Sequence, residues 1–238
     1  MKRMLAAGYD KIFQICPCFR AGERGDRHLP EMTLLEWYTA RADYRDMMTQ
    51  CEGLIKHVAN SLGLPGLRYQ GSAIDLSGSW PRLTVAEAFT YHGSMSVGRA
   101  LETGRFDEIL GLEIEPALGT VQPVFLYDYP AQCAALARRK GTNPDIAERF
   151  ELYIAGLELC NAFSELTDPV EQRARFEQAL DERAADGKTR YPLPEAFLAT
   201  LADMPVAAGT ALGIDRLVML LTDTARIDDV VGFIPEEL

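Results

Sequence analysis

Residues 19–38, FRAGERGDRHLPEMTLLEWY, combine cationic groups with a carboxylate that lies among apolar neighbours. The first half contains Arg20 and His28 and is a candidate basic pocket in an otherwise acidic chain. The second half contains Glu36 and Tyr38, and a carboxylate beside an aromatic ring suits recognition of an ammonium group by charge and cation–π attraction. One short segment therefore offers groups for two kinds of ligand chemistry.

A second polar group lies on residues 157–165, LELCNAFSE. Asn161, Phe163 and Glu165 alternate along an extended segment and so point to one side. Glu158 has the opposite parity and reaches that side only if the strand carries a bulge. Taken alone, such a wall is more typical of a solvated sheet face, but the similar carboxylate and aromatic pair in residues 19–38 favours a binding site.

Small residues mark the last strand-like segment, AAGTALG, residues 207–213. Gly209, Ala211 and Gly213 occupy every second position, which lets a ligand lie flat on the backbone. Arg216 follows closely and could cover an aromatic base or pair with phosphate. Close packing between a sheet and a helix would explain the pattern alone, whereas its combination with the Arg-rich segment favours a ligand site.

The elements that must position these groups are mainly strands. Residues 11–20 alternate in character, with Gln14, Cys16 and Cys18 on one side, and predict a half-buried strand. Residues 32–39 predict the next strand, so the two form an antiparallel hairpin. Its polar loop of about a dozen residues is long for a simple connection and indicates function.

The remaining segments predict an α+β domain in which antiparallel strands are interrupted by helices. Helices are expected at 43–62 with Asp43 as N-cap, around VAEAF and FDEIL, after Asp168 with a buried stripe of Phe176, Ala179, Leu180 and Ala184, and over IDRLVMLLT. Strands are expected at 123–130, in two pieces of 147–168 around Gly156, and at 207–213.

Length and composition are typical of one large globular domain, spanning residues 1–238. The net charge of −11 argues against broad, salt-driven attachment to nucleic acid. The longest apolar runs are shorter than a membrane span, and the basic start has no signal-peptide core, so we expect no membrane association and a cytoplasmic location.

The five cysteines are an odd number with no secretory context, and we expect reduced thiols. Cys16-Pro-Cys18 has the residues of a metal or redox site. Structural zinc, however, usually needs two or more residues between paired cysteines and a second pair elsewhere. Two strand thiols are therefore the favoured interpretation, with a metal site as the alternative.

These motifs together resemble a known family. FRAGERGDRHLPEMTLLEWY is similar to motif 2 of the class II aminoacyl-tRNA synthetases, GTALGIDRLVML to motif 3, and ERFELYIAGLELCNAFSELTD to the lysyl subgroup. The LEWY ending, the YPAQCAALA segment and Ala211 resemble the truncated lysyl-tRNA synthetase paralogues that modify elongation factor P. The resemblance covers residues 1–238 and implies a class II synthetase-like antiparallel sheet flanked by helices.

The resemblance also implies ligands and roles. ATP with Mg²⁺ would be the cofactors, a lysine-type amino acid such as lysine or (R)-β-lysine the substrate, and elongation factor P the acceptor. Catalytic roles would fall on Arg20 at the α-phosphate and Arg216 on adenine. ATP contacts would fall on Arg20, Glu23, His28, Met32, Glu151, Glu158, Gly213 and Arg216, and Mg²⁺ contacts on Glu151 and Glu158. Substrate contacts would fall on Glu36, Tyr38, Asn161, Phe163, Glu165, Gly209 and Ala211.

Three departures from the family pattern leave alternatives open. Gly22 stands where the family has Glu, with Glu23 one place later, and Met32 stands where the family has an adenine-packing Phe. Motif 1, which normally builds the dimer interface, precedes the region that Met1 begins. A homodimer is therefore an open expectation, and we expect tRNA not to be the acceptor. A non-catalytic module that binds ATP and lysine is the alternative to the enzyme, and a lysyl-tRNA synthetase fragment is a third.

Overall fold

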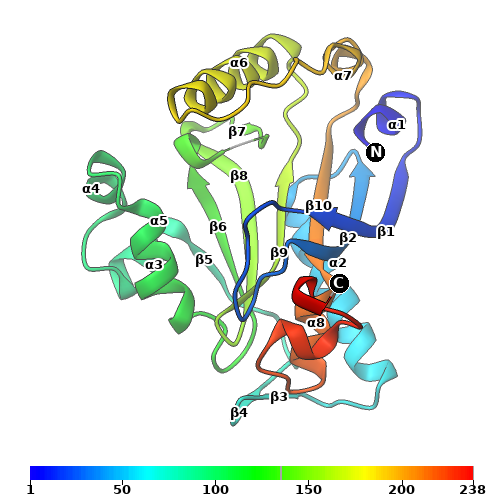
Figure 1. Cartoon of the computed structure of the whole chain (residues 1–238), viewed down its shortest axis with the longest axis vertical. Coiled ribbons are helices and arrows are strands. Elements are labelled where there is room, and N and C mark those ends of the chain that lie inside the picture. The colour runs from blue at the N-terminus through cyan, green and yellow to red at the C-terminus, as the bar shows by residue number, and fades with distance from the viewer. Residues whose placement is uncertain (135, 238) are drawn as a thin grey trace.

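The computed structural model describes residues 1–134 and 136–237, and in them one eight-stranded sheet forms the centre of the fold (Figure 1). The strand order is β1-β2-β10-β9-β8-β6-β5, with β7 paired to β8. The bounds are β1 Lys11–Phe19, β2 Glu31–Ala40, β5 Arg82–Thr84, β6 Val124–Pro130, β7 Arg139–Lys140, β8 Asn143–Ile154, β9 Leu157–Ser164 and β10 Ala207–Gly213. Described neighbours in this sheet pair antiparallel except β5 and β6. The expected α+β sheet is confirmed, with one parallel pair added.

Strands β1 and β2 form the predicted hairpin, with Gln14 opposite Glu36. Strand β1 lies at the edge of the sheet, and its two faces differ in solvent exposure. The side with Gln14 is half-buried, whereas Phe13, Ile15 and Phe19 on the other side are 74%, 60% and 71% exposed. The alternation was predicted correctly, but the polar side is the more covered one.

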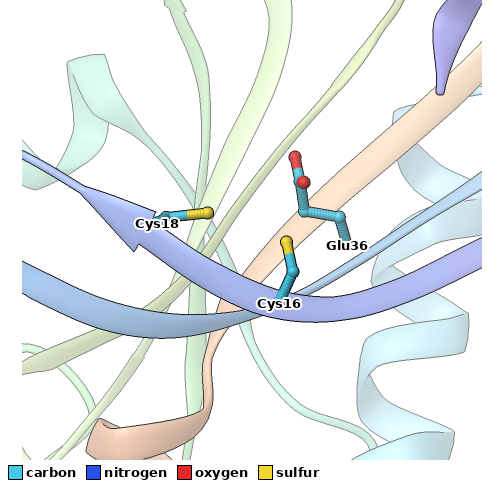
Figure 2. Close-up of side chains that lie close together, drawn as sticks. All are labelled: Cys16, Cys18 and Glu36. Carbon is cyan, nitrogen blue, oxygen red and sulfur yellow. The ribbon is translucent and has the colours of Figure 1, made fainter.

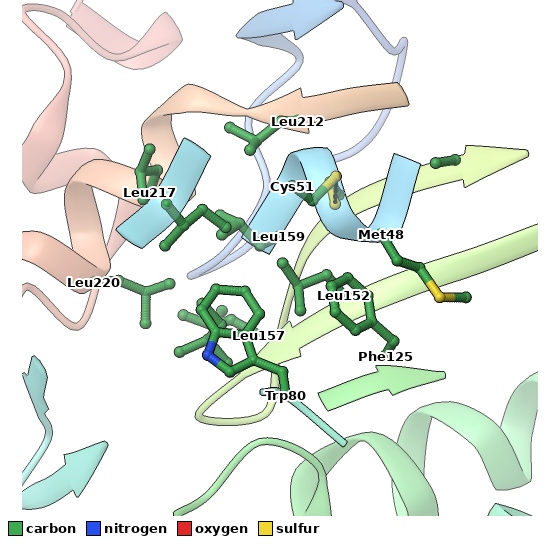
Figure 3. Close-up of a cluster of buried hydrophobic side chains, with 14 of the residues drawn as sticks. Met48, Cys51, Trp80, Phe125, Leu152, Leu157, Leu159, Leu212, Leu217 and Leu220 are labelled. Carbon is green, nitrogen blue, oxygen red and sulfur yellow. Dashed lines mark hydrogen bonds between the residues drawn. The ribbon is translucent and has the colours of Figure 1, made fainter. Parts of the chain in front are cut away.

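Helix α2, Tyr44–Ser61, covers one face of the sheet and builds the main core. Asp43 caps it by accepting hydrogen bonds from the backbone of Arg45 and Asp46, which confirms the predicted N-cap. Its buried side packs apolar residues against the sheet, as Figure 3 shows. The labelled members include Met48, Cys51, Phe125, Leu152, Leu159 and Leu212.

A second core lies at β6. There, α3 (Val85–His92) packs against the strand, and α4 (Val97–Glu102), α5 (Phe106–Ile109) and the π-helix Leu110–Ile114 complete the same apolar cluster. A short hairpin of β3 (Leu67–Tyr69) and β4 (Ser72–Ile74) lies beside α8 (Ile214–Leu221). The expected short helices around VAEAF and FDEIL are thereby confirmed. Among the described residues, no helix combines the length and the apolar character needed to cross a membrane.

Helix α6, Pro169–Ala185, corrects one expectation. Asp168 caps it as predicted, accepting hydrogen bonds from the backbone of residues 170 and 171. Its expected buried stripe is wrong, because Ala179 and Ala184 are exposed and Phe176 and Leu180 are only half-buried. The helix lies at the outer end of the fold beside α7 (Glu195–Leu198), so little covers its apolar side (Figure 1).

The pairing of β8 with β9 contains the bulge that the position of Glu158 requires. Leu152 pairs with Cys160 while Tyr153 pairs with Glu158, so Leu159 is the extra residue. The bulge reverses the parity of Glu158 relative to Asn161. The sequence-based condition for placing both residues in one site is therefore met.

Gly119 supports the turn between these strands and gives a stability prediction. It has a φ of +70°, and a Cβ there would lie 2.5 Å from the carbonyl oxygen of Tyr153. Gly119→Ala should lower the free energy of unfolding by about 2–4 kcal/mol, because backbone atoms would have to move. Urea unfolding measures this. Gly53→Ala, in an exposed position of α2 with open space around it, is the control and should stabilise by up to about 1 kcal/mol. Equal midpoints for the two variants would contradict the prediction.

Candidate active site

The predicted site residues lie on the sheet face opposite to α2. Cys160 of β9 and Thr210 of β10 both contact Cys51 of α2, with Sγ–Sγ and Sγ–Oγ1 distances of 3.7 and 3.9 Å. Their neighbours Asn161 and Ala211 therefore point to the other face, where they are partners in the β9–β10 register. The period-two argument for this wall is confirmed by the strand pairing.

One cavity on this face collects nine of the predicted site residues. They are Arg20, Glu23, His28, Met32, Glu158, Asn161, Ala211, Gly213 and Arg216. The other predicted residues adjoin it along the strands rather than lining it, and these are Glu36, Tyr38, Glu151, Phe163, Glu165 and Gly209. The lining set holds the residues assigned to the nucleotide except Glu151, together with Asn161 and Ala211 from the amino-acid assignment.

The hairpin loop presents Arg20 at the mouth of this cavity. The backbone N–H of Glu23 donates to the carbonyl of Arg20 at 3.3 Å, which closes a turn. Gly22 occupies the third position with a φ of +80°, where a residue without Cβ is favoured. The turn brings the Glu23 carboxylate to 3.3 Å from the Arg20 guanidinium. Gly22 therefore permits the turn that places Glu23 beside Arg20, and a role for Glu23 in place of the family Glu stays a prediction.

Arg216, at the start of α8, connects three parts of the cavity wall. Its guanidinium donates to the carbonyl oxygens of Glu158 and Arg27 at 2.6 and 3.2 Å. It also lies 2.8 Å from Nε2 of His28. The adjacent Asp215 accepts a hydrogen bond from the backbone of Thr33 at 2.8 Å, which attaches the beginning of α8 to β2. Arg216 is thus held by several partners rather than extending freely.

His28 is neutral in this arrangement. Arg216 can only donate, so the Nε2 atom of His28 must accept and its proton resides on Nδ1. Burial, followed by the positive charge of Arg216, lowers the pKa of His28. The geometry and the direction of the pKa shift agree.

Both carboxylate oxygens of Glu151 accept hydrogen bonds from neighbouring side chains. One oxygen accepts from Arg149 at 2.5 Å and from Asn161 at 3.0 Å. The other accepts from Tyr129 at 2.5 Å and from Tyr153 at 2.7 Å. Glu151 is 6% exposed and orients the Asn161 amide toward the cavity. A cation at Glu151 would have to replace one of these four donors.

Glu158 and Glu115 are two further acidic residues whose charges act on the same region as Glu151. Burial and the charge of Glu151 raise the pKa of Glu158 to about 7, while Arg216 opposes that rise. Burial also raises the pKa of Glu115, which accepts a hydrogen bond from Tyr153 at 3.0 Å. Of these carboxylates, Glu158 lines the cavity, while Glu115 and Glu151 both accept hydrogen bonds from the Tyr153 hydroxyl.

Glu165 forms an ammonium-binding position at the far end of the wall. It is 1% exposed, and the Nζ atom of Lys2 lies 2.6 Å from it. The same Nζ lies 5.2 Å from the centre of the Phe163 ring. Neither Glu165 oxygen has a donor in hydrogen-bond geometry among the described residues, so the contact with Lys2 is a charge contact. Burial raises the pKa of Glu165, and Lys2 opposes that rise.

Gly209 allows Tyr38 to approach this position. A Cβ on Gly209 would lie 2.4 Å from the Tyr38 ring and 3.0 Å from an oxygen of Glu165. Burial and the charges of Glu165 and Glu36 raise the pKa of the Tyr38 hydroxyl, which therefore remains protonated. Gly209 was predicted to let a ligand approach the backbone. In the structure the Tyr38 ring occupies the space that a side chain on Gly209 would need.

Several residues that contribute to the site were missed by sequence reasoning. Arg149 and Gln14 share strand parity with predicted residues, and Gln14 donates to Glu36 at 2.6 Å, so alternation could have found both. Lys2 and Glu115 come from segments far away in sequence. No local pattern marks their approach to Glu165 and Tyr153.

Comparison with known proteins supports the motif-based resemblance. A family model described as tRNA synthetases class II (D, K and N) matches residues 1–237. The chain belongs to the class II tRNA synthetases. Among its relatives, the lysine–tRNA ligase of Moorella thermoacetica is 42% identical over 98% of this chain and 52% of its own length. Those of Pelotomaculum thermopropionicum and Magnetococcus marinus are 40% and 38% identical, each over 98% of this chain and 51% of their own length.

The chain spans about half the length of the curated relatives that it matches. Class II tRNA synthetases use ATP and Mg²⁺, and the cations that line the cavity suit the phosphates of a nucleotide. The cavity offers Arg20, His28 and Arg216, and Glu158 is a carboxylate that lines the same cavity. Oxygen ligands together with substrate phosphates are the environment that Mg²⁺ prefers.

Proposed function

We propose that this class II synthetase domain activates a lysine-type amino acid with ATP and transfers it to a lysine side chain of elongation factor P. The observation that carries the proposal is the buried ammonium position at Glu165. A primary ammonium already lies there, on Lys2, between a carboxylate and an aromatic ring. The side-chain ammonium of lysine or (R)-β-lysine has the same chemistry.

The site residues divide the reaction between them. Glu165, Phe163 and Tyr38 would hold the substrate ammonium, leaving its carboxylate directed toward the cavity that contains Arg20. The substrate carboxylate oxygen attacks the α-phosphorus, the bond to the β-phosphate oxygen breaks, and pyrophosphate leaves. Arg20 would neutralise charge that develops on the α-phosphate. The acceptor amine then attacks the acyl carbon, loses its proton, and releases AMP.

The nucleotide would lie between the hairpin loop and α8. Arg216 would cover adenine beside Met32, a flexible thioether that can pack on a ring face. Glu158 and Glu151 would hold Mg²⁺ on the nucleotide phosphates. When bound, the ion supplies charge neutralisation during pyrophosphate departure.

The acceptor is proposed from the resemblance of LEWY, YPAQCAALA and Ala211 to the paralogues that modify elongation factor P. Aminoacylation of tRNA is the competing reaction, because the relatives compared above are lysine–tRNA ligases. Pyrophosphate exchange with lysine and (R)-β-lysine tests the first step, and mass spectrometry of elongation factor P together with tRNA charging tests the second. Modified protein with uncharged tRNA supports the proposal, and charged tRNA with unmodified protein overturns it.

A non-catalytic module that binds ATP and lysine is the second candidate. The contact between Lys2 and Glu165 raises it, because an ammonium of the chain competes with the substrate ammonium and would lower turnover. Calorimetry that detects binding of ATP and lysine, combined with no pyrophosphate exchange, would establish this function instead.

Lys2 should act as an internal competitor for that position. Lys2→Met should increase the affinity for lysine-type ligands by about tenfold, because the competing ammonium is removed. Arg3→Met is the matched control, since Arg3 is exposed on the same helix, α1 (Lys2–Ala6). Calorimetry measures both variants. Equal ligand affinities for Lys2→Met and Arg3→Met would contradict the prediction, because they would show that Lys2 does not compete with the ligand.

Ala211 should influence which lysine isomer is used. It pairs with Glu36 on one side and Asn161 on the other, so its methyl group lies between two predicted substrate contacts. Ala211→Gly should shift the ratio of kcat/KM toward α-lysine by about tenfold, because it creates space beside the substrate backbone. Pyrophosphate exchange with both isomers measures the ratio. An unchanged ratio would remove Ala211 from the specificity argument.

A further inference from the structure

Cys16 and Cys18 of β1 and Glu36 of β2 direct their side chains toward one another, as Figure 2 shows. One potential ligand atom from each residue lies within 4.8 Å of the others. All three residues are half-buried. The cluster is therefore compact enough to surround one ion and still reachable from solvent.

The hairpin register explains how this cluster forms. Gln14 is opposite Glu36 and Cys16 is opposite Leu34, so Glu36 lies diagonally across from Cys16 on the same face. Pro17 separates the two cysteines and lacks a backbone donor, which an edge strand tolerates. Two residues between cysteines, the usual zinc spacing, are not needed here, because an extended strand already turns residues 16 and 18 to one side.

We propose that Cys16, Cys18 and Glu36 form a binding site for a zinc-like divalent metal ion. Thiolates with a carboxylate are a ligand set that suits zinc and disfavours Mg²⁺. Three protein ligands leave one tetrahedral position open for water or another small ligand. Binding breaks two S–H bonds, forms two metal–sulfur bonds, and releases two protons to the solvent.

The rest of the described chain does not offer an equivalent set. Cys51 and Cys160 are close, but both are fully buried in the core and have no carboxylate within the cluster. The acidic residues around Glu151 are not gathered within the same distance, and both oxygens of Glu151 already accept hydrogen bonds. Among the described residues, the hairpin is therefore the place where three potential ligand atoms gather closely enough to surround an ion.

Metal at the hairpin would change the use of Glu36. Its carboxylate now accepts a hydrogen bond from Gln14 at 2.6 Å, and a metal would compete with that bond. Glu36 is also a substrate contact under the proposed function, so zinc should inhibit amino-acid activation. That consequence depends on the proposed function, whereas metal binding itself does not.

Cobalt is the probe that tests the site. We expect the reduced full chain to bind about one equivalent of Co²⁺ with a thiolate-to-cobalt charge-transfer band and intense visible bands of tetrahedral coordination, both removed by Zn²⁺. Cys16→Ser and Cys18→Ser should each weaken the charge-transfer band and lower the affinity at least tenfold, because even changes to groups that only support metal ligands typically cost about 10–100-fold. Cys133→Ser is the matched control and should retain both bands. Glu36→Gln should keep the charge-transfer band while lowering the affinity.

Three results would overturn the proposal. They are the absence of a charge-transfer band in chain whose thiols titrate as reduced, retention of the band in both serine variants at positions 16 and 18, and its loss in Cys133→Ser. Weak visible bands typical of six-coordinate cobalt would instead place the ion at oxygen ligands. These spectra require no catalysis, so they remain informative if the chain shows no pyrophosphate exchange.

Discussion

Arg216→Ala is expected to lower kcat/KM for ATP in pyrophosphate exchange by about 10²–10³. Arg216 is the residue that joins the Glu158 carbonyl, the Arg27 carbonyl and the His28 ring in the cavity wall. Its loss removes both the group proposed to cover adenine and the local positive charge. Losses of this size are typical when a preorganised electrostatic contact is deleted.

A second measurement separates this role from general damage to the fold. Burial and then Arg216 lower the pKa of His28, so the pKa of His28 should rise toward its ordinary value in Arg216→Ala. NMR titration of the imidazole detects the shift without any turnover. Arg105→Ala, which removes an exposed pair with Glu108, is the control and should leave both activity and the His28 titration unchanged. An Arg216→Ala variant with full exchange activity would remove Arg216 from the nucleotide site.

Strand alternation predicted much of the site because it depends on local geometry. The period of two placed Asn161, Phe163 and Glu165 on one face, and the requirement for a bulge at Glu158 followed from parity alone. The hairpin also followed from local pattern, although its long loop hid the turn at Gly22 that moves Glu23 toward Arg20.

Contacts between distant segments could not be predicted in this way. Lys2 reaches Glu165 from helix α1 at the start of the chain, and Glu115 reaches Tyr153 from a short 3-10 helix. Periodicity also indicates which side of an element is apolar without indicating whether anything covers it. For that reason α6 and the outer side of β1 are more exposed than their patterns suggest.

Glu165→Gln is expected to lower kcat/KM for lysine-type substrates by about 10²–10³ while leaving the affinity for ATP unchanged. Glu165 is almost completely buried, so a substrate ammonium that enters beside Phe163 needs this carboxylate to balance its charge. Removing one partner of a buried ion pair costs about 3–5 kcal/mol, which is roughly two to four orders of magnitude in affinity, and the expected loss lies in the lower part of that range. Pyrophosphate exchange at several amino-acid concentrations measures the loss.

Lys2 makes the interpretation of this variant testable. In the present arrangement Glu165 balances the charge of Lys2, so Glu165→Gln also frees that side chain and could alter α1. Combining Glu165→Gln with Lys2→Met removes both charges, and the double variant should fold stably while remaining defective with lysine. Glu195→Gln, which changes an exposed carboxylate paired with Arg173, is the control and should behave like the unmodified chain. Recovery of lysine-dependent exchange in the double variant would mean that Glu165 serves to hold Lys2 rather than the substrate.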